Sequence, residues 1–317
     1  MRHAMTTMKR SILSLLLAVT PWVAANAGPL QRQHVASDTK WVLHLDLDAF
    51  RTTQVGAEAV RGKLGRDMAK AQADLKTYLD FDFDWAQIHS LTAYGFDFAP
   101  KNQSQGVLLI ATSLDVQKGL EAAITKQAEA SVENGNVRRL ADSPVAVYSI
   151  RNEFLVALPP GNPVVLAKTD ALLQKGLAVL AGRHPNLAST AVFTDFPPQP
   201  NAVVFVGMAE GFNANTPVPP QARVFQMADG GRLALGETGN QVFVAATLKA
   251  KSSEVSAQMQ QILQGLLALG ALGQPQNQEL QQLIQAARVS VNDRFVSIEV
   301  QLPATTVIQK MQEKERR

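Results

Sequence analysis

The sequence predicts an α+β fold made of two tandem related domains, each an antiparallel sheet with helices packed on one face. Three observations lead to this class. Strand-like runs are joined by links of hairpin length, which favour antiparallel pairing over long crossovers. Amphipathic helical stretches follow pairs of these runs. The same order of elements occurs in the first and second halves of the chain.

The clearest folded unit lies in the second half. Residues 232–237 and 241–248 form a predicted hairpin around Thr238-Gly239-Asn240. Ser252 then offers an N-cap to a helix with an apolar stripe, which ends near Gly273. A short helix from about residue 278, a second hairpin and a last helix follow. In residues 295–302 apolar and polar side chains alternate, which predicts one buried and one solvated face.

The first half is predicted to have the same alternation of strand pairs and helices, with more strands. We predict a strand at residues 41–47, then one long amphipathic helix to about Tyr78 despite Gly56, Gly62 and Gly65. The remaining predicted elements are strands at 91–98 and 106–112, a helix capped by Ser113, strands at 145–150, 153–158 and 163–167, and a helix from Thr169 to Gly182.

An internal repeat is predicted from two matches between the halves. Residues 41–50 resemble residues 203–212, and residues 106–112 resemble residues 241–247. The second half lacks the long helix, because Pro217, Pro219 and Pro220 interrupt that region. We therefore expect a first domain at 40–183, a proline-rich linker at 184–200 and a second domain at 201–317.

The amino terminus has the form of a secretory signal peptide at residues 1–27. It contains three basic residues, an apolar core at 12–19 and Ala25-Asn26-Ala27 before Gly28. We predict cleavage after Ala27, a flexible lead-in at 28–39, and a periplasmic or extracellular mature protein. No later stretch has the length and apolarity that a membrane-spanning helix needs, and the chain is cysteine-free, so disulfides are excluded.

The charge balance excludes one class of partner. The three basic residues of the signal account for the whole excess of 30 Lys+Arg over 27 Asp+Glu, so the mature chain is formally neutral. Without a basic run interleaved with aromatic residues, no nucleic-acid partner is expected.

The run DWAQIHSLTAYG at residues 84–95, followed by a predicted hairpin and helix, resembles a pattern in exported bacterial two-part α+β proteins of uncharacterised function. The resemblance implies export and a two-part architecture. It implies no active-site residue.

His44, Asp46 and Asp48 are the first candidates for metal ligands, because they lie on one side of a predicted strand. Residues two apart are about 6.6 Å apart along a strand, so the outer pair is roughly 13 Å apart and does not close on one ion. We predict instead a solvated or sheet-edge face, with Asp48 capping the following helix.

Asp80, Asp82 and Asp84 imitate the start of a calcium loop. The required glycine and glutamate positions of that loop hold Trp85 and Leu91 instead, so no calcium site is expected. The aromatic residues between these aspartates are predicted to be buried.

Nucleophilic and nucleotide chemistry have little support. There is no Gly-x-Ser-x-Gly motif, His89 and His184 stand alone, and Gly230-Gly231 precedes a strand rather than a helix. The apolar run at 262–272 is interpreted as a core helix, with a lipid-lined pocket as the alternative. No catalytic residue, metal or cofactor is assigned.

Three functions remain open. The first is a non-enzymatic envelope or secreted protein that binds another envelope protein or acts as a scaffold through a sheet face. The second is a periplasmic carrier of an apolar, lipid-like ligand held between helices and sheet. The third is a hydrolase with an unrecognised site.

Overall fold

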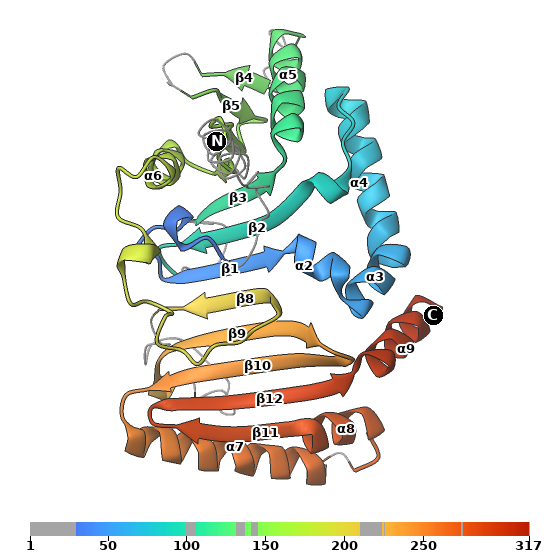
Figure 1. The fold of residues 1–317 in the computed structure, drawn as a ribbon, viewed down its shortest axis with the longest axis vertical. Coiled ribbons are helices and arrows are strands. Elements are labelled where there is room, and N and C mark those ends of the chain that lie inside the picture. The colour runs from blue at the N-terminus through green and yellow to red at the C-terminus, as the bar shows by residue number, and fades with distance from the viewer. Residues whose placement is uncertain are drawn as a thin grey trace, which may run out of the picture.

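All strands of the described chain belong to one antiparallel sheet. The structure is a computed structural model that describes residues 30–98, 106–130, 137–140, 145–209, 224, 226–273 and 275–316. Its 12-stranded sheet has the order β11-β12-β10-β9-β8-β1-β2-β3-β7-β6-β5-β4. Figure 1 shows this sheet running along the length of the molecule. The predicted signal peptide at residues 1–27 and the three prolines of 217–220 lie outside the described residues.

The first half contributes seven strands. They are β1 (Trp41–Asp46), β2 (Ile88–Gly95), β3 (Gly106–Thr112), β4 (Val137–Arg139), β5 (Val147–Ile150), β6 (Phe154–Ala157) and β7 (Val164–Ala167). Its helices are η1 (Arg32–His34), α2 (Leu47–Thr52), α3 (Gln54–Arg61), α4 (Lys63–Leu79), η2 (Trp85–Gln87), α5 (Leu114–Ala130) and α6 (Asp170–Leu180).

The second half contributes five strands. They are β8 (Ala202–Met208), β9 (Ala228–Thr238), β10 (Gln241–Ala250), β11 (Ala287–Asn292) and β12 (Phe295–Pro303). Its helices are η3 (Leu187–Ser189), α7 (Ser253–Gly273), α8 (Gln278–Ala286) and α9 (Ala304–Glu315). Thr169 caps α6 as predicted, and Ser252 accepts a hydrogen bond from the Val255 amide at the start of α7.

The antiparallel α+β class is confirmed, but the two halves do not form separate sheets. β1 pairs with β8 from Trp41 opposite Met208 to Leu45 opposite Val204. Outward from this pair, β1-β2-β3-β7 in one direction mirrors β8-β9-β10-β12 in the other. The internal repeat stays a prediction, and the two stretches on which it mainly rests contain the two central strands.

Helices lie on both faces of the sheet in the first half. Ile124 of α5 packs with Tyr148 and Val164, whereas α6 packs on the opposite face, where Gly176 meets the side chains of Val107 and Val165. α7 lies on the same face as α5 and packs through Met259 on Leu248 and Val296. In Figure 1, α5 and α7 lie near opposite ends of the sheet.

The long helix predicted after β1 is three helices. Thr53 has an extended backbone and caps α3 with its side chain, and Gly62 leaves the helical conformation between α3 and α4. The hydrophobic stripe continued through both breaks, so periodicity alone did not reveal them.

The expected flexible lead-in and proline-rich linker both pack into the core. Val35 and Ala36 are fully buried, and so is Leu187 of the other segment. The Arg32 guanidinium joins them by donating to the carbonyl oxygens of residues 187, 190 and 192. The polar and proline content of these segments favoured exposed, flexible chain, but a few apolar residues hold both segments in the core.

Candidate functional site

One face of six neighbouring strands, from β2 to β12 in the order of the sheet, carries two continuous rows of apolar side chains. Cross-strand neighbours point to the same side of a sheet. The first row holds Ala93, Leu43, Val206, Leu233, Ala246 and Ile298, and the second holds Leu91, Leu45, Val204, Leu235, Val244 and Val300. We call these twelve residues the open face. Leu43 is 41% exposed and Val244 is 37% exposed, and the other ten are half-buried.

Strand β1 buries the side that carries Val42, His44 and Asp46, whereas its other side, which is apolar throughout, is partly exposed. His44 and Asp46 are only 4% and 7% exposed, whereas Leu43, the residue before His44, is 41% exposed and Leu45, between the two, is half-buried. This corrects the prediction of a solvated or sheet-edge position for His44 and Asp46, because β1 is a central strand. A sheet with one solvated face normally turns its apolar side inward, so the open face is an unusual exposure of apolar side chains.

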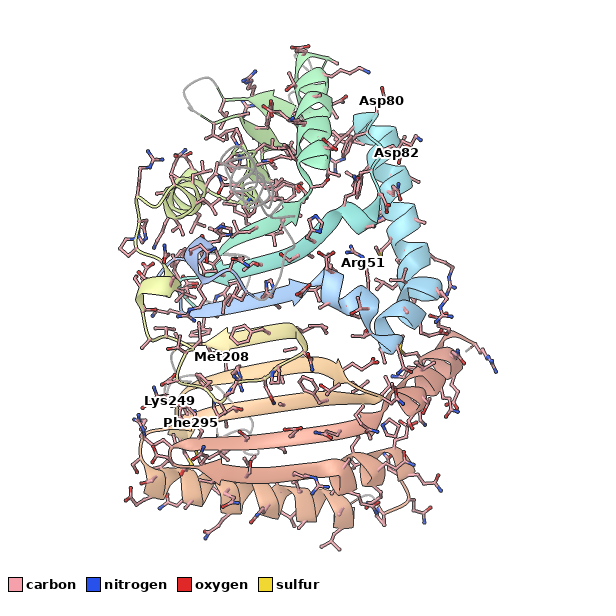
Figure 2. All side chains as sticks on the ribbon, viewed as in Figure 1. Arg51, Asp80, Asp82, Met208, Lys249 and Phe295 are labelled. Carbon is pink, nitrogen blue, oxygen red and sulfur yellow. The ribbon has the colours of Figure 1, made fainter. Side chains whose placement is uncertain are left out.

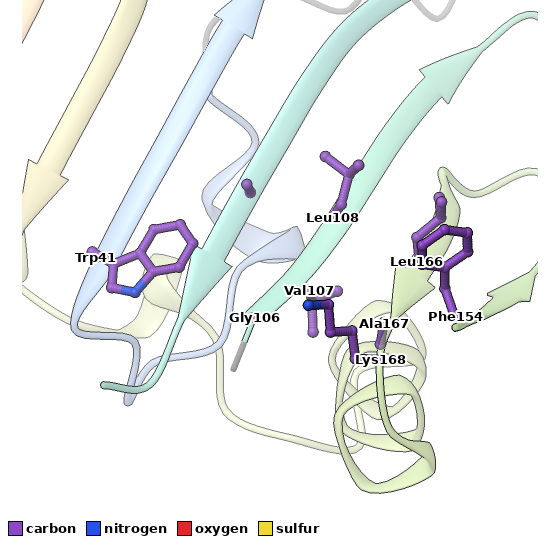
Figure 3. Close-up of a pocket in the computed structure, with 9 residues that line it drawn as sticks. Trp41, Gly106, Val107, Leu108, Phe154, Leu166, Ala167 and Lys168 are labelled. Carbon is purple, nitrogen blue, oxygen red and sulfur yellow. The ribbon is translucent and has the colours of Figure 1, made fainter. Parts of the chain in front are cut away.

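An apolar groove continues the open face toward β7. It has a volume of about 310 Å³, and its wall includes Trp41, Leu108, Phe154 and Leu166, with Lys168 as its one charged lining residue. Figure 3 shows Trp41 and Phe154 on opposite sides of this groove. The groove is therefore an open hollow on the sheet, away from the apolar run of α7 where a lipid pocket was considered.

Two glycines make room for the Trp41 ring. A Cβ added at Gly95 would lie 2.5 Å from the indole, and one at Gly106 would lie 3.3 Å from it. The indole nitrogen donates to the carbonyl oxygen of Asp97, 2.9 Å away. Trp41 is consequently held across β2 and β3, where it forms one wall of the groove.

The polar candidates of β1 serve the backbone and a neighbouring strand. Nδ1 of His44 lies 2.9 Å from Oγ1 of Thr92 on β2. Asp46, rather than Asp48, is the N-cap of α2, and its carboxylate accepts from the Ala49 amide at 2.9 Å. The cap of this helix therefore lies two residues before the predicted one.

The sequence suggested that His89 has no partner, but the structure gives it one. It lies at an irregularity of the β2–β3 pairing, and its Nδ1 is 2.9 Å from Oδ2 of Asp48. Arg51 donates to Oδ1 of Asp48 at 2.8 Å and also to the carbonyl oxygens of Trp85 and Ile88. This arrangement fixes the chain that enters β2. A histidine–carboxylate pair could orient a proton carrier, but no nucleophile is shown beside it.

Asp80, Asp82 and Asp84 are kept apart. Asp80 pairs with Lys126 and Asp82 pairs with Lys76, and these hydrogen bonds hold the pKa of both carboxyl groups below its usual range. Asp84 caps η2. Figure 2 shows Asp80 and Asp82 near the end of α4. Phe81 stacks on Phe83, which meets Trp85 edge-on. These three rings, predicted to be buried, are only half-buried.

The other candidates are dispersed. His184 lies beside the carbonyl of Pro185, and Gly230-Gly231 lie inside β9. In α7 the apolar run is partly outside the core, since Leu269 and Leu272 are 66% and 78% exposed. Within the described ranges, no three potential ligands among His, Cys, Asp and Glu gather at one point. None of the helices described here is long and apolar enough to cross a membrane.

Comparison with known proteins finds no matching family model and no matching curated protein. Among solved structures, crystal form III of TP0453 is similar at 11% identity and a TM-score of 0.46, covering 90% of this chain and 99% of that chain. Crystal forms I and IV of TP0453 give 13% identity each, with TM-scores of 0.46 and 0.47 and coverage of 90% and 91% of this chain and 98% of theirs. Similarity at this level assigns no role to any residue.

Proposed function

We propose that this chain is an exported, non-enzymatic binding protein that holds another envelope protein on its open face. The observation that carries the proposal is the inversion at β1, where Leu43 is exposed while His44 and Asp46 are buried. Exposed apolar surface is costly in water unless a partner covers it. The partner is therefore expected to present an apolar surface of its own.

The extent of the open face favours a protein over a small molecule. Six strands at roughly 4.8 Å spacing make the rows about 24 Å wide. Pockets for small ligands enclose most of the ligand, whereas protein interfaces are broad surfaces of about 800 Å² on each partner. A broad row without charged side chains matches the central part of such an interface.

The polar groups on and near β1 support a binding role rather than catalysis. Asp46 is used as a helix cap, His44 bonds to Thr92, and Arg51 with Asp48 fixes the entry to β2. These contacts give each of these polar side chains a structural role, so none of them needs a catalytic role to explain its position.

Charge substitutions on the open face test the proposal. Leu43→Lys combined with Val206→Lys places two cations in one cross-strand row and should abolish co-purification of the partner from the native envelope. Leu114→Lys is the matched control, because Leu114 is 50% exposed but lies on α5, outside the open face. Equal co-purification with both variants would refute the assignment of the open face.

A second candidate is a carrier of an apolar, lipid-like ligand. The groove of about 310 Å³ between Trp41 and Phe154, with Lys168 as its one charged lining residue, favours this function. Native mass spectrometry of protein isolated from its own envelope distinguishes the candidates, since the carrier would retain a mass of lipid size and the protein-binding module would retain a polypeptide.

Export is the other part of the proposal. The basic start, the short apolar core and Ala25-Asn26-Ala27 support cleavage after Ala27. Amino-terminal sequencing of the protein from its native source should begin at Gly28, and a mature protein that begins at Met1 would contradict export by this route.

A further inference from the structure

Arg232 is a buried cation on the face of β9 opposite the open face. It is 8% exposed and lies between Gly207 of β8 and Thr247 of β10. Its Nε is buried without a hydrogen-bond partner, and no described residue forms an ion pair with its guanidinium. The guanidinium carbon lies 5.6 Å from the centroid of the Phe196 ring.

Such a residue is difficult to explain by stability alone. A buried charge is usually paired and hydrogen-bonded, because removal from water without compensation is strongly unfavourable. Burial lowers the pKa of Arg232, which reflects the same desolvation. The contact with Phe196 offsets part of this loss but supplies no anion. A charge kept under these conditions points to a ligand that compensates it.

A cleft lies next to Arg232 along the same strand. Its volume is about 400 Å³, and its wall includes Phe193, Phe196, Gly230 and Lys249. Gly230 is two residues from Arg232, so the two lie on the same side of β9, and Lys249 is the cross-strand neighbour of Gly230. The Phe196 ring thus contacts the cleft and also borders the buried guanidinium. Figure 2 shows Lys249, Met208 and Phe295 at this end of the strands.

The charges around the cleft favour an anion. Lys249 is paired with Asp195, which forms part of the cleft wall, and the exposed side chains of Arg294 and Asp229 lie at its margin. These four charges balance, so among the residues that the structure describes here the charge of Arg232 is a positive excess. The two phenylalanines supply an apolar wall for the body of the ligand.

We propose that this cleft binds a small organic anion with an aromatic or otherwise apolar body. Lys249 would hold the charged group, the buried charge of Arg232 behind Phe196 would attract it, and the body would pack on Phe193 and Phe196. The site is independent of the open face, because Arg232 and Leu233 are adjacent on β9 and point to opposite sides of the sheet. It would give a small anion a separate site on a protein whose open face remains available to its partner.

Titration calorimetry with 2-naphthoate, and with neutral 2-naphthalenemethanol as the isosteric comparison, tests the proposal on the full mature chain. Naphthoate should bind with one-to-one stoichiometry and at least tenfold more tightly than the alcohol. Lys249→Met should weaken naphthoate at least tenfold because a charge-assisted hydrogen bond is lost, and Arg232→Met should weaken it at least tenfold because a nearby positive charge in a poorly solvated position is lost. Asp195→Asn should strengthen it several-fold by freeing Lys249. Lys168→Met is the control, because Lys168 lines the other hollow.

Thermal unfolding separates a binding role of Arg232 from a structural one. If the arginine is kept for a ligand, Arg232→Met should leave the Tm of the ligand-free protein unchanged or raise it, because a buried unpaired charge has been replaced by an apolar chain. A large fall in Tm, or failure of Arg232→Met to fold, would contradict this part of the proposal. Absence of saturable naphthoate binding, or equal weakening in Lys168→Met, would overturn the cleft as an anion site.

Discussion

The indole of Trp41 occupies the space that a side chain at Gly95 would take, and a Cβ built there would come within 2.5 Å of the ring. The pair joins the first residue of β1 to the last residue of β2 and shapes the groove at the edge of the open face. A wall of the groove therefore depends on a residue that contributes no side chain to it.

Gly95→Val should destabilise the protein by about 1–3 kcal/mol, the usual result of overpacking. The indole must leave its position, and its hydrogen bond to the Asp97 carbonyl is lost. Urea unfolding measures the loss. Gly265→Ala is the control, since Gly265 lies inside α7 with open space around its Cα, and alanine there should stabilise by up to about 1 kcal/mol. A Gly95→Val protein as stable as wild type would show that Trp41 is not held where the structure places it.

Arg51→Met should cost about 1.5–3 kcal/mol, because its guanidinium donates to the Trp85 and Ile88 carbonyls as well as to Asp48. His89→Gln should cost less than about 1 kcal/mol, since this partly exposed pair with Asp48 resembles a surface ion pair. Chemical denaturation of both variants checks the order. The reverse order would mean that His89, rather than Arg51, fixes the entry to β2.

Glu315 links the last helix to the first half. Its carboxylate accepts from the Lys63 amide at 2.6 Å, which caps α4 where Gly62 offers no side chain, and from Arg66 at 3.0 Å. These bonds lower the pKa of Glu315. The stabilisation is complete above the ordinary glutamate pKa of about 4.3 and is lost as the pH falls through the lower pKa of the folded state.

Glu315→Gln should therefore speed hydrogen exchange in the first turn of α4 at pH 7. Its protection in that turn should no longer change between about pH 5 and pH 3, the range in which a carboxyl group titrates. In the wild type, exchange there should rise relative to the rest of α4 over the same interval. Glu313→Gln, two residues away, supplies the control. If wild type and Glu315→Gln lose protection in parallel on acidification, the cap does not depend on this carboxylate.

Local signals in the sequence identified most elements but not their partners. The hairpin at Gly239, the Thr169 cap and the last two strands could be predicted because each depends on neighbouring residues. The pairing of β1 with β8 joins residues about 160 positions apart, and nothing in either strand specifies it. Joining the halves in this way made β1 an interior strand and buried His44 and Asp46, which were expected at a solvated or edge position.

Two features of the candidate sites are visible in the sequence once the strands are known. Arg232 occurs at a position that alternates with Leu233 and Leu235, among the small residues Gly230, Ala234 and Gly236, and a lone arginine there is unusual for a central strand. In β8, three successive apolar residues from Val204 to Val206 indicate a strand that is apolar on both faces. The pair of His89 with Asp48 had no such signal, because it depends on the β1–β2 register.

Hydrogen-exchange mass spectrometry of the complex isolated from the native envelope tests the central claim most directly. Exchange should slow in β1, β8 and β9 when the partner is bound and should not change at the cleft around Lys249. This protection should be lost in Leu43→Lys combined with Val206→Lys but not in Leu114→Lys. Protein that elutes from its own envelope without a polypeptide partner, or partner protection confined to elements away from these strands, would contradict the claim that the open face binds another protein.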